Sequence, residues 1–347
     1  MEIVFDKGIF IPGLDLWLDS TRKKEFCVVS HAHSDHVARH NVPVMTKGTF
    51  SLLKDYYRKS DPVVVDYGEE IEYSGFSLSF YPAGHCLGSA QILVKDKSTG
   101  LRVVYTGDYK MTPSPVNEDS SVIPCDVLVL DATYGKTQYI FPNESEIIQT
   151  VAQILNGWFL EGYRPILEGW KLGKAQEILF HMLNHGFKVV VEDSIFQICK
   201  VYESEGVQFP GNYRLFEGDW AADEILLCPP NRTKKLMVQH YNAKRIMRLT
   251  GWALDYASGT RYGRTMIPYS DHADFKQLLN YVGQSGASTI YTVNGFSEFI
   301  LYALPCRSTS SEFSIISFEH ETKKKIDILN KINLMPYSCT LKSKFHL

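Results

Sequence analysis

Four side chains that can bind a metal ion occur within one short segment of the sequence. The segment HAHSDH contains His31, His33, Asp35 and His36, and it directly follows the apolar run Phe26–Ser30. Alternate residues of an extended segment lie on the same side, which places His31 and His33 together. A helix that begins near Asp35 would direct Asp35 and His36 toward the same point. Because imidazole nitrogens and carboxylate oxygens suit Zn²⁺, Mn²⁺ or iron, this spacing predicts a metal site.

Two further candidate ligands follow apolar runs later in the chain. His85 lies in PAGHCLGS after the run Phe76–Tyr81, and Asp108 lies in TGD after the run Arg102–Thr106. The glycines beside His85 allow a tight loop that aims the imidazole inward. Either residue alone would more often be a turn residue, since Gly–Asp is a common turn signal. Their order behind HAHSDH, each at the end of a predicted strand, favours the metal-site interpretation.

The first third of the chain predicts the strands that must position these ligands. Short runs of β-branched and aromatic residues are separated there by Gly, Pro and Asp, which is the usual pattern of strands and turns. The predicted strands are Phe26–Ser30, Phe76–Tyr81, Ala90–Val94, Arg102–Thr106 and Val127–Asp131.

Beyond about residue 145 the pattern changes to alternating helices and strands. A helix over Ser145–Trp158 precedes two strand-and-helix units, and a strand–helix–strand pattern returns near residues 265–300. Such alternation is typical of parallel strands in an α/β layer. We therefore predict one domain over residues 1–154 and 263–347, with a second domain over 155–262 inserted into it. The two units are Arg164–Leu167 with Ala175–Leu183, and Phe187–Glu192 with Ile195–Val201.

Composition restricts the class of protein. The 347 residues are 44% hydrophobic, which suffices for more than one domain. The net charge of −3 means that local basic patches and metal ions would have to attract a nucleic acid. The sequence shows no signal peptide and no apolar stretch long enough for a bilayer. Seven scattered cysteines without a CxxC pair favour a reducing cytoplasm over a disulfide framework or a zinc ribbon.

The ordered ligand motifs resemble the metallo-β-lactamase superfamily across nearly the whole chain. The resemblance implies an α/β fold, specifically an αββα sandwich with two divalent metal ions at one edge, Zn²⁺ being favoured and Mn²⁺ the alternative. It also implies that Asp19 of LWLDS supports the ligand loop without binding metal; by itself Asp19 would be read as a turn residue. The implied ligands are His31, His33 and His85 for one metal, and Asp35 and His36 for the other, with Asp108 bridging.

Later motifs resemble the β-CASP nuclease branch of this superfamily. VLDATYG, which contains Asp131, looks like the acidic motif of that branch, and PYSDHADF, which contains His272, looks like its later histidine motif. The predicted insertion lies between them, as the β-CASP cap domain does. Within the insertion, GWKLGKAQ resembles a segment of the DNA-ligase-associated exonucleases of bacteria and archaea. Together with GHCLGSAQ, GDYK and SDHADF, it makes that group the one that the chain resembles most.

The resemblance implies hydrolysis of a phosphodiester bond. Two metal ions would activate a water and neutralise charge on the phosphorane. His272 would then be the general acid for the leaving oxygen, and Asp131 would fix its tautomer and raise its pKa. Without the metal motif, His272 would be read as an ordinary histidine of a surface loop.

Basic residues of the insertion are candidate contacts to the substrate. Lys174 follows Gly173 at a predicted helix N-terminus, which suits a phosphate, although an ordinary strand–turn–helix connection is an equal alternative. Residues 231–264 combine many basic residues with aromatic ones, including Tyr241 and Trp252, which is typical of single-strand binding. Charge runs are more often solvated faces, as we expect for Lys323–Lys325. The chosen contacts are Lys171, Lys174, Lys244, Arg245 and Arg248.

One position departs from the family pattern. Most β-CASP nucleases have a further histidine before a glycine, and it completes the second metal site. Here Asn294 precedes Gly295. A related DNA-repair branch of the family also lacks this histidine and has a Val–Asn pair nearby. We therefore expect the second metal ion to bind more weakly than the first.

These observations favour a metal-dependent DNA exonuclease in the cytoplasm, acting on single strands. The DNA preference comes from the ligase-associated resemblance, which also makes a DNA ligase or a helicase a candidate partner. The alternatives are an RNA-processing endonuclease or exonuclease of the same branch and a nucleic-acid-binding scaffold with a degenerate site. The retained ligands argue against the scaffold, and the insertion argues against a small-molecule hydrolase.

Overall fold

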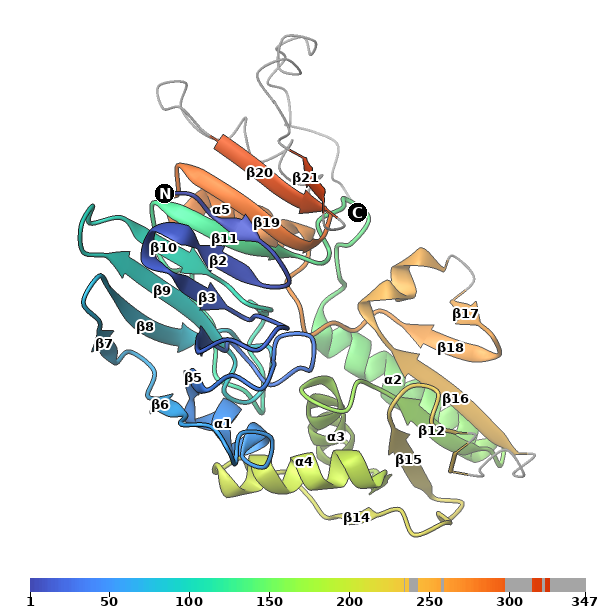
Figure 1. Cartoon of the computed structure of the whole chain (residues 1–347). Helices are drawn as coiled ribbons and strands as arrows, with labels where there is room; N and C mark the ends of the chain where they lie inside the picture. The colour runs from blue at the N-terminus through green and yellow to red at the C-terminus, as the bar shows by residue number, and fades with distance from the viewer. Residues whose placement is uncertain (234, 237–242, 257–258, 297–313, 320–321, 325–347) are drawn as a thin grey trace, which may run out of the picture.

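The computed structural model describes residues 1–233, 235–236, 243–256, 259–296, 314–319 and 322–324 (Figure 1). Within these ranges the chain forms three β-sheets and several helices, which confirms the predicted α/β class. None of the described helices has the length and apolar character needed to cross a membrane.

The first two sheets pack face to face around one apolar core. Residues such as Val28 and Val44 of the first sheet meet Phe80, Ile92 and Val129 of the second. The first sheet has the order β1-β2-β3-β4-β5-β6 and the second β21-β20-β19-β11-β10-β9-β8-β7. The strands are β1 (Val4–Phe5), β2 (Ile9–Ile11), β3 (Leu16–Leu18), β4 (Phe26–Val28), β5 (Val42–Thr46), β6 (Val63–Val65), β7 (Glu70–Glu72), β8 (Phe76–Pro82), β9 (Ala90–Asp96), β10 (Arg102–Tyr105), β11 (Val127–Ala132), β19 (Thr289–Gly295), β20 (Ser314–Glu319) and β21 (Thr322–Lys324).

A helix covers the outer face of each of these two sheets. Helix α1 (Lys47–Leu53) packs Leu53 against Val29, which follows β4, and against Met45 of β5. Helix α5 (Phe275–Ser285) begins at an Asp274 capping box and packs Leu278 against the second sheet. The five strands predicted in the first third are all present as β4, β8, β9, β10 and β11, with ends shifted by one or two residues.

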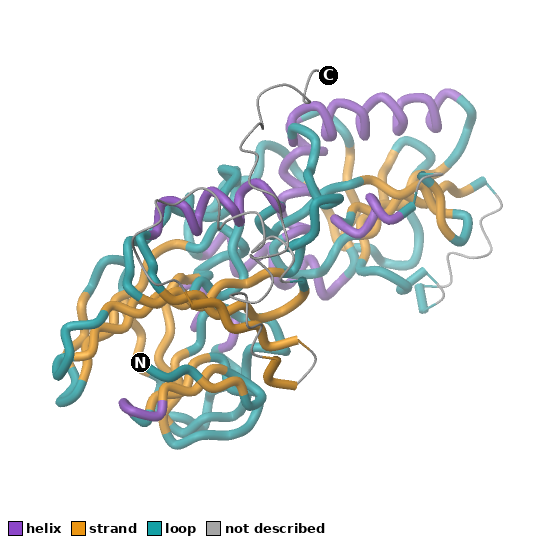
Figure 2. The backbone as a smooth tube through the Cα atoms, turned by 90° about the horizontal axis from the view of Figure 1, so that it is seen from above, coloured by secondary structure: helices purple, strands orange, loops and turns teal. Residues whose placement is uncertain are grey.

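The third sheet carries helices α2 (Glu144–Leu160), α3 (Lys174–Asn184) and α4 (Asp193–Ser204) on one face, where their apolar residues share a core with its strands. Figure 2 shows this unit extending away from the first two sheets. The helix and the two strand-and-helix units predicted here are confirmed. In order across the sheet, the strands are β14 (Tyr213–Leu215), β13 (Lys188–Val191), β15 (Glu224–Cys228), β12 (Arg164–Glu168), β16 (Lys244–Leu249), β18 (Arg264–Ile267) and β17 (Thr260–Arg261), all parallel except the pair β17–β18.

A buried ionic cluster joins the third sheet's helices to the loop after β10. The Lys110 ammonium lies 2.9 Å from Glu177 Oε2 of α3 and 2.9 Å from Glu144 Oε2 of α2. The Tyr269 hydroxyl lies within 3.0 Å of both carboxylates. Buried charges are tolerated when they are paired and hydrogen-bonded, so this cluster fixes α2 and α3 beside the loop that carries Asp108.

Candidate metal centre

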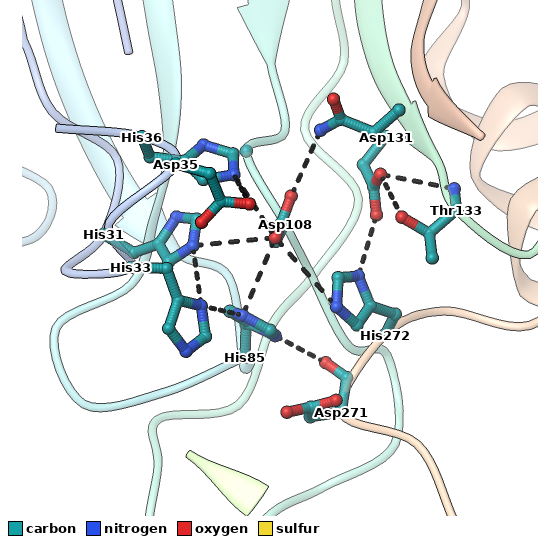
Figure 3. Close-up of polar contacts among 12 residues, drawn as sticks. His31, His33, Asp35, His36, His85, Asp108, Asp131, Thr133, Asp271 and His272 are labelled. Carbon is teal, nitrogen blue, oxygen red and sulfur yellow. Dashed lines mark hydrogen bonds and ion pairs between the residues drawn. The ribbon is translucent and has the colours of Figure 1, made fainter. Parts of the chain in front are cut away.

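The predicted ligands converge where strands of the first two sheets end (Figure 3). The HAHSDH segment follows β4, while His85 follows β8 and Asp108 follows β10. Ligand atoms of His31, His33, His85 and Asp108 all lie within 4.8 Å of one another. The convergence arises because these strands end at one edge of the sandwich.

No helix begins near Asp35. Residues 34–35 form a turn instead, in which the His36 amide donates to the carbonyl oxygen of His33 at 3.1 Å. The Asp35 side chain is 80% exposed, and its Oδ2 lies 4.0 Å from Nε2 of His36. A tight turn places these two side chains together without a helix, because it reverses the chain within a few residues.

The protein backbone sets the protonation of two of the histidines. Nε2 of His33 lies 3.3 Å from the carbonyl oxygen of Leu172, and Nδ1 of His85 lies 2.8 Å from that of Asp271. Because a carbonyl oxygen only accepts, these ring nitrogens donate, and a neutral imidazole has no second proton. The opposite nitrogens therefore carry lone pairs instead of protons. These are His33 Nδ1 and His85 Nε2, which face each other at 3.0 Å.

His31 is oriented in the same way through its neighbours in the sequence. The Ser30 hydroxyl donates to the Asp19 carboxylate, so its oxygen accepts from Nδ1 of His31 at 2.9 Å. Nε2 of His31 then also carries a lone pair, and it lies 3.1 Å from Nδ1 of His33. Asp19 holds this loop further by accepting from the Ser30 amide at 2.7 Å and the Tyr105 hydroxyl at 2.9 Å.

Three imidazole lone pairs and one carboxylate thus point at a common centre. Oδ2 of Asp108 lies 3.6 Å from Nε2 of His31 and 3.8 Å from Nε2 of His85. Burial lowers the pKa of His85 to about 3, assisted by the nearby His272, and burial also lowers the pKa of His31 and His33. Neutral imidazoles whose lone pairs face one another repel unless a cation lies between them. The donor set therefore fits a divalent metal ion.

Further donors lie around Asp108, with the His36 ring 4.1 Å from the His31 ring. Nδ1 of His36 donates to Asp19 Oδ2 at 2.8 Å, so Nε2 of His36 faces Asp108 Oδ2 at 3.5 Å. Although burial disfavours the charged imidazole, the carboxylates of Asp108 and Asp19 raise the pKa of His36. Asn294, at φ 55°, donates its side-chain amide to Asp108 Oδ1 at 3.4 Å. His36 and Asn294 thus both adjoin Asp108, and Asp35 lies beside His36.

His272 also adjoins Asp108. Its Nδ1 donates to Asp131 Oδ2 at 3.1 Å, and its Nε2 lies 4.0 Å from Asp108 Oδ2. The Thr133 hydroxyl donates to the other oxygen of Asp131 at 2.8 Å. Burial opposes the charged form, but the carboxylates of Asp108 and Asp131 raise the pKa of His272 to about 9. Both carboxylates therefore favour the charged imidazole, whose Nε2 lies toward the centre.

The structure gives Lys174 a different environment from the expected phosphate contact. Lys174 is buried, and its ammonium lies 2.8 Å from Oδ1 of Asp271. Asp271 is also the residue whose carbonyl oxygen accepts from His85. The pair therefore positions a metal-ligand candidate and does not face solvent. Sequence reasoning missed this role of Asp271, although the residue lies inside the SDHADF motif.

The other predicted substrate contacts belong to the third sheet and its loops. Lys171 is exposed in the loop before α3, and Lys244 begins β16. Arg245 is exposed with its guanidinium 4.1 Å from the Tyr163 ring. Arg248 is instead held by the buried Glu168 carboxylate at 2.6 Å. Of the wider basic and aromatic stretch, Lys234 and Tyr241 lie outside the described residues, as does Lys325 of the triple-lysine segment.

Comparisons with known proteins complete the description. No protein-family model matches the chain. The chain is 29% identical over 299 residues to a protein named Probable DNA ligase from Opitutus terrae, covering 85% of this chain and 29% of that protein. It is 31% identical over 117 residues to Endoribonuclease YSH1 of Eremothecium gossypii, covering 33% and 15%. It is 26% identical over 185 residues to an RNase J-like protein of Methanocaldococcus jannaschii, covering 46% and 43%.

The chain thus spans less than half the length of each of these relatives. Two of the three relatives are ribonucleases by name, and the similarity to the third extends over most of this chain. The strand-end histidines and Asp108 occur in the order that the resemblance implies, and the structure brings them to one centre. The chain therefore belongs to the β-CASP nuclease branch of the metallo-β-lactamase superfamily.

Proposed function

We propose that the protein is a metal-dependent DNA exonuclease. The observation that carries this proposal is the set of facing lone pairs on His31, His33 and His85 beside Asp108, which is stable only around a cation. These residues would hold one metal ion, and Asp35, His36 and Asp108 would hold a second. When bound, two such ions supply an activated water and neutralise charge on the phosphorane.

The chain's own residues complete this chemistry. His272 would donate the proton on Nε2 to the leaving oxygen, and Asp131 would hold Nδ1 so that this proton stays directed at the centre. Asp19 would keep the His31 and His36 rings in place, since its carboxylate is bonded to the His36 ring directly and to the His31 ring through Ser30.

The third sheet and its helices would be the β-CASP cap. We predicted an insertion over residues 155–262. Helix α2 packs in the core of this sheet, and strand β18 is hydrogen-bonded to β16 within it. We therefore propose cap boundaries near Glu144 and Ile267. The Lys174–Asp271 pair and the Lys110 cluster would then hold the cap against the metal centre.

The proposed substrate is single-stranded DNA, and the proposed partner is a DNA ligase or a helicase. The similarity to part of a protein named Probable DNA ligase supports this choice. RNA is the second candidate substrate, because other relatives are named as ribonucleases. The five described cysteines are buried and free, which suits the proposed cytoplasmic location.

Digestion of end-labelled single-stranded DNA and RNA of matched sequence tests the proposal. With Zn²⁺ or Mn²⁺ supplied separately, we expect DNA to shorten progressively from one end and RNA to be degraded more slowly. A chelator should stop both reactions. Faster degradation of RNA would favour the RNA-processing alternative, and no cleavage of either strand with either metal would contradict a nuclease.

Asn294 predicts unequal affinities for the two metal ions. A neutral amide oxygen is a poorer zinc ligand than an imidazole nitrogen, and Asn294 already donates to Asp108. We expect the dialysed protein to retain closer to one metal ion than two, and its activity to rise with added metal. Asn294→His should raise the metal content and reduce that dependence.

Elemental analysis after dialysis, with activity titrated against free metal, checks this prediction. Asn231→His is a suitable control, since Asn231 also has a positive φ but lies in the third-sheet unit beside Glu168. Two retained metal ions in the unaltered protein, unchanged by Asn294→His, would show that another residue completes the site.

A further inference from the structure

A cluster of aromatic rings lies beside His272. The ring of Tyr134 has its centroid 6.0 Å from that of His272, with the two rings nearly perpendicular. The ring of Trp252 lies 4.8 Å from that of Tyr134, and it meets the Tyr139 ring edge-on at 5.4 Å. Phe296 contacts Trp252 edge-on at 6.4 Å. A single ring therefore separates Trp252 from the proposed general acid.

Trp252 differs from the rings beneath it in its exposure. Tyr134 and Tyr139 are each 2% exposed, whereas Trp252 is 37% exposed. A large aromatic residue gains stability by burial, yet more than a third of the surface of Trp252 stays exposed while its ring contacts Tyr134 and Tyr139. Tyr134 and Tyr139 therefore support an aromatic surface that remains accessible at the edge of the metal centre.

The backbone around Trp252 is held in place from two directions. The 3-10 helix Gly251–Asp255 carries Trp252, and the Asp255 carboxylate accepts from Gln138 at 2.7 Å and from the Tyr139 hydroxyl at 2.8 Å. A Cβ atom at Gly251 would lie 2.4 Å from the Tyr134 ring, so the backbone here packs directly on that ring. The indole is thus presented by a short anchored segment and is ordered before any ligand arrives.

Positive charge accompanies this surface. The Lys136 ammonium lies 4.0 Å from the centroid of the Phe296 ring, within the same cluster. Aromatic rings combined with nearby cations are the usual means of binding a single strand, because every base has a face that stacks and every linkage carries a negative charge.

We propose that Trp252 is a stacking platform for the nucleobase adjacent to the scissile phosphate. The inference rests on the proposed function, and it specifies where the strand lies: it would pass from the metal centre over Tyr134 to the exposed indole. Stacking does not distinguish base identity, so this subsite would hold the strand without reading its sequence.

Binding of labelled single-stranded DNA in the presence of a chelator tests the platform. Trp252→Ala should weaken binding by roughly 5- to 150-fold, the range for loss of one stacked base. Trp252→Phe should retain most of the affinity because it keeps an aromatic face. Leu160→Ala is the control: this side chain is 91% exposed at the far end of α2, about 25 Å along the helix from Glu144.

An abasic nucleotide moved along the strand separates stacking from a structural effect. For the unaltered protein, one abasic position should reduce affinity about as much as Trp252→Ala does. In Trp252→Ala, the same abasic position should cause no further loss, since the two changes remove one contact. Under turnover, Trp252→Ala should raise KM much more than it lowers kcat.

The platform would be overturned if the affinity losses from Trp252→Ala and from the abasic nucleotide were additive. It would also be overturned if every abasic position reduced the affinity of Trp252→Ala by the same amount. Loss of affinity in Trp252→Phe equal to that in Trp252→Ala would also overturn it. These outcomes differ from failure of the proposed function, in which the unaltered protein cleaves no strand with either metal.

Discussion

Replacing Asp35 with alanine is expected to abolish hydrolysis while leaving the fold intact. Asp35 is a proposed ligand of the second metal ion, and its removal would weaken both activation of the water and neutralisation of charge, each worth several kcal/mol. The rate should therefore fall by about 10³-fold or more. The fold should tolerate the change because the Asp35 side chain is 80% exposed and lies on a turn.

Rates measured after chelation and restoration of metal, together with thermal unfolding, check this expectation. Asp55→Ala is the matched control, since Asp55 is an exposed aspartate near α1. Turnover of Asp35→Ala within about tenfold of the unaltered protein would rule out a mechanism that needs both metal ions. A large fall in unfolding temperature would assign Asp35 a structural role instead.

Replacing His272 with alanine is expected to lower the rate by roughly 10²- to 10⁴-fold, the range for general acid–base catalysis. The imidazole is directed at the centre by Asp131, whose carboxylate, with that of Asp108, raises the pKa of His272 to about 9. Both carboxylates favour the protonated imidazole that a general acid requires. Asp131→Asn should cause part of the same loss, because an amide no longer favours that protonation.

The leaving group distinguishes an acid from a merely structural residue. A nitrophenyl ester needs no proton on departure, so the loss in His272→Ala should shrink on such a substrate. His185→Ala, at an exposed histidine that ends α3, should leave both rates unchanged. Equal losses on nucleic acid and on the nitrophenyl ester would count against His272 as the acid.

The strands and the order of their ligands follow from the sequence alone. Each of His31, His85 and Asp108 lies a few residues after a run of β-branched or aromatic residues, and these runs form β4, β8 and β10. Such signals are local, because alternation and turn residues act within a few positions of the chain. The chemical types of the site were therefore predictable before their distances were known.

The shape of HAHSDH was less predictable. Its polar residues are compatible with either a turn or the first turn of a helix, and the chain adopts the turn. Several strands of the first sheet, such as β1, β2 and β6, have two or three residues and leave too short a pattern to recognise. Packing against the second sheet stabilises them, and that information is not local.

The orientation of the imidazoles required the tertiary structure. Nε2 of His33 meets the carbonyl oxygen of Leu172, 139 positions away, and Nδ1 of His85 meets that of Asp271, 186 positions away. Backbone carbonyls exist at every residue, so no residue type marks the two that are used. Likewise, Lys174 was expected to contact phosphate, yet its ammonium pairs with Asp271. Residue types determine which donors are available, whereas the packing of distant segments determines which nitrogen holds the proton and which is left for a metal ion.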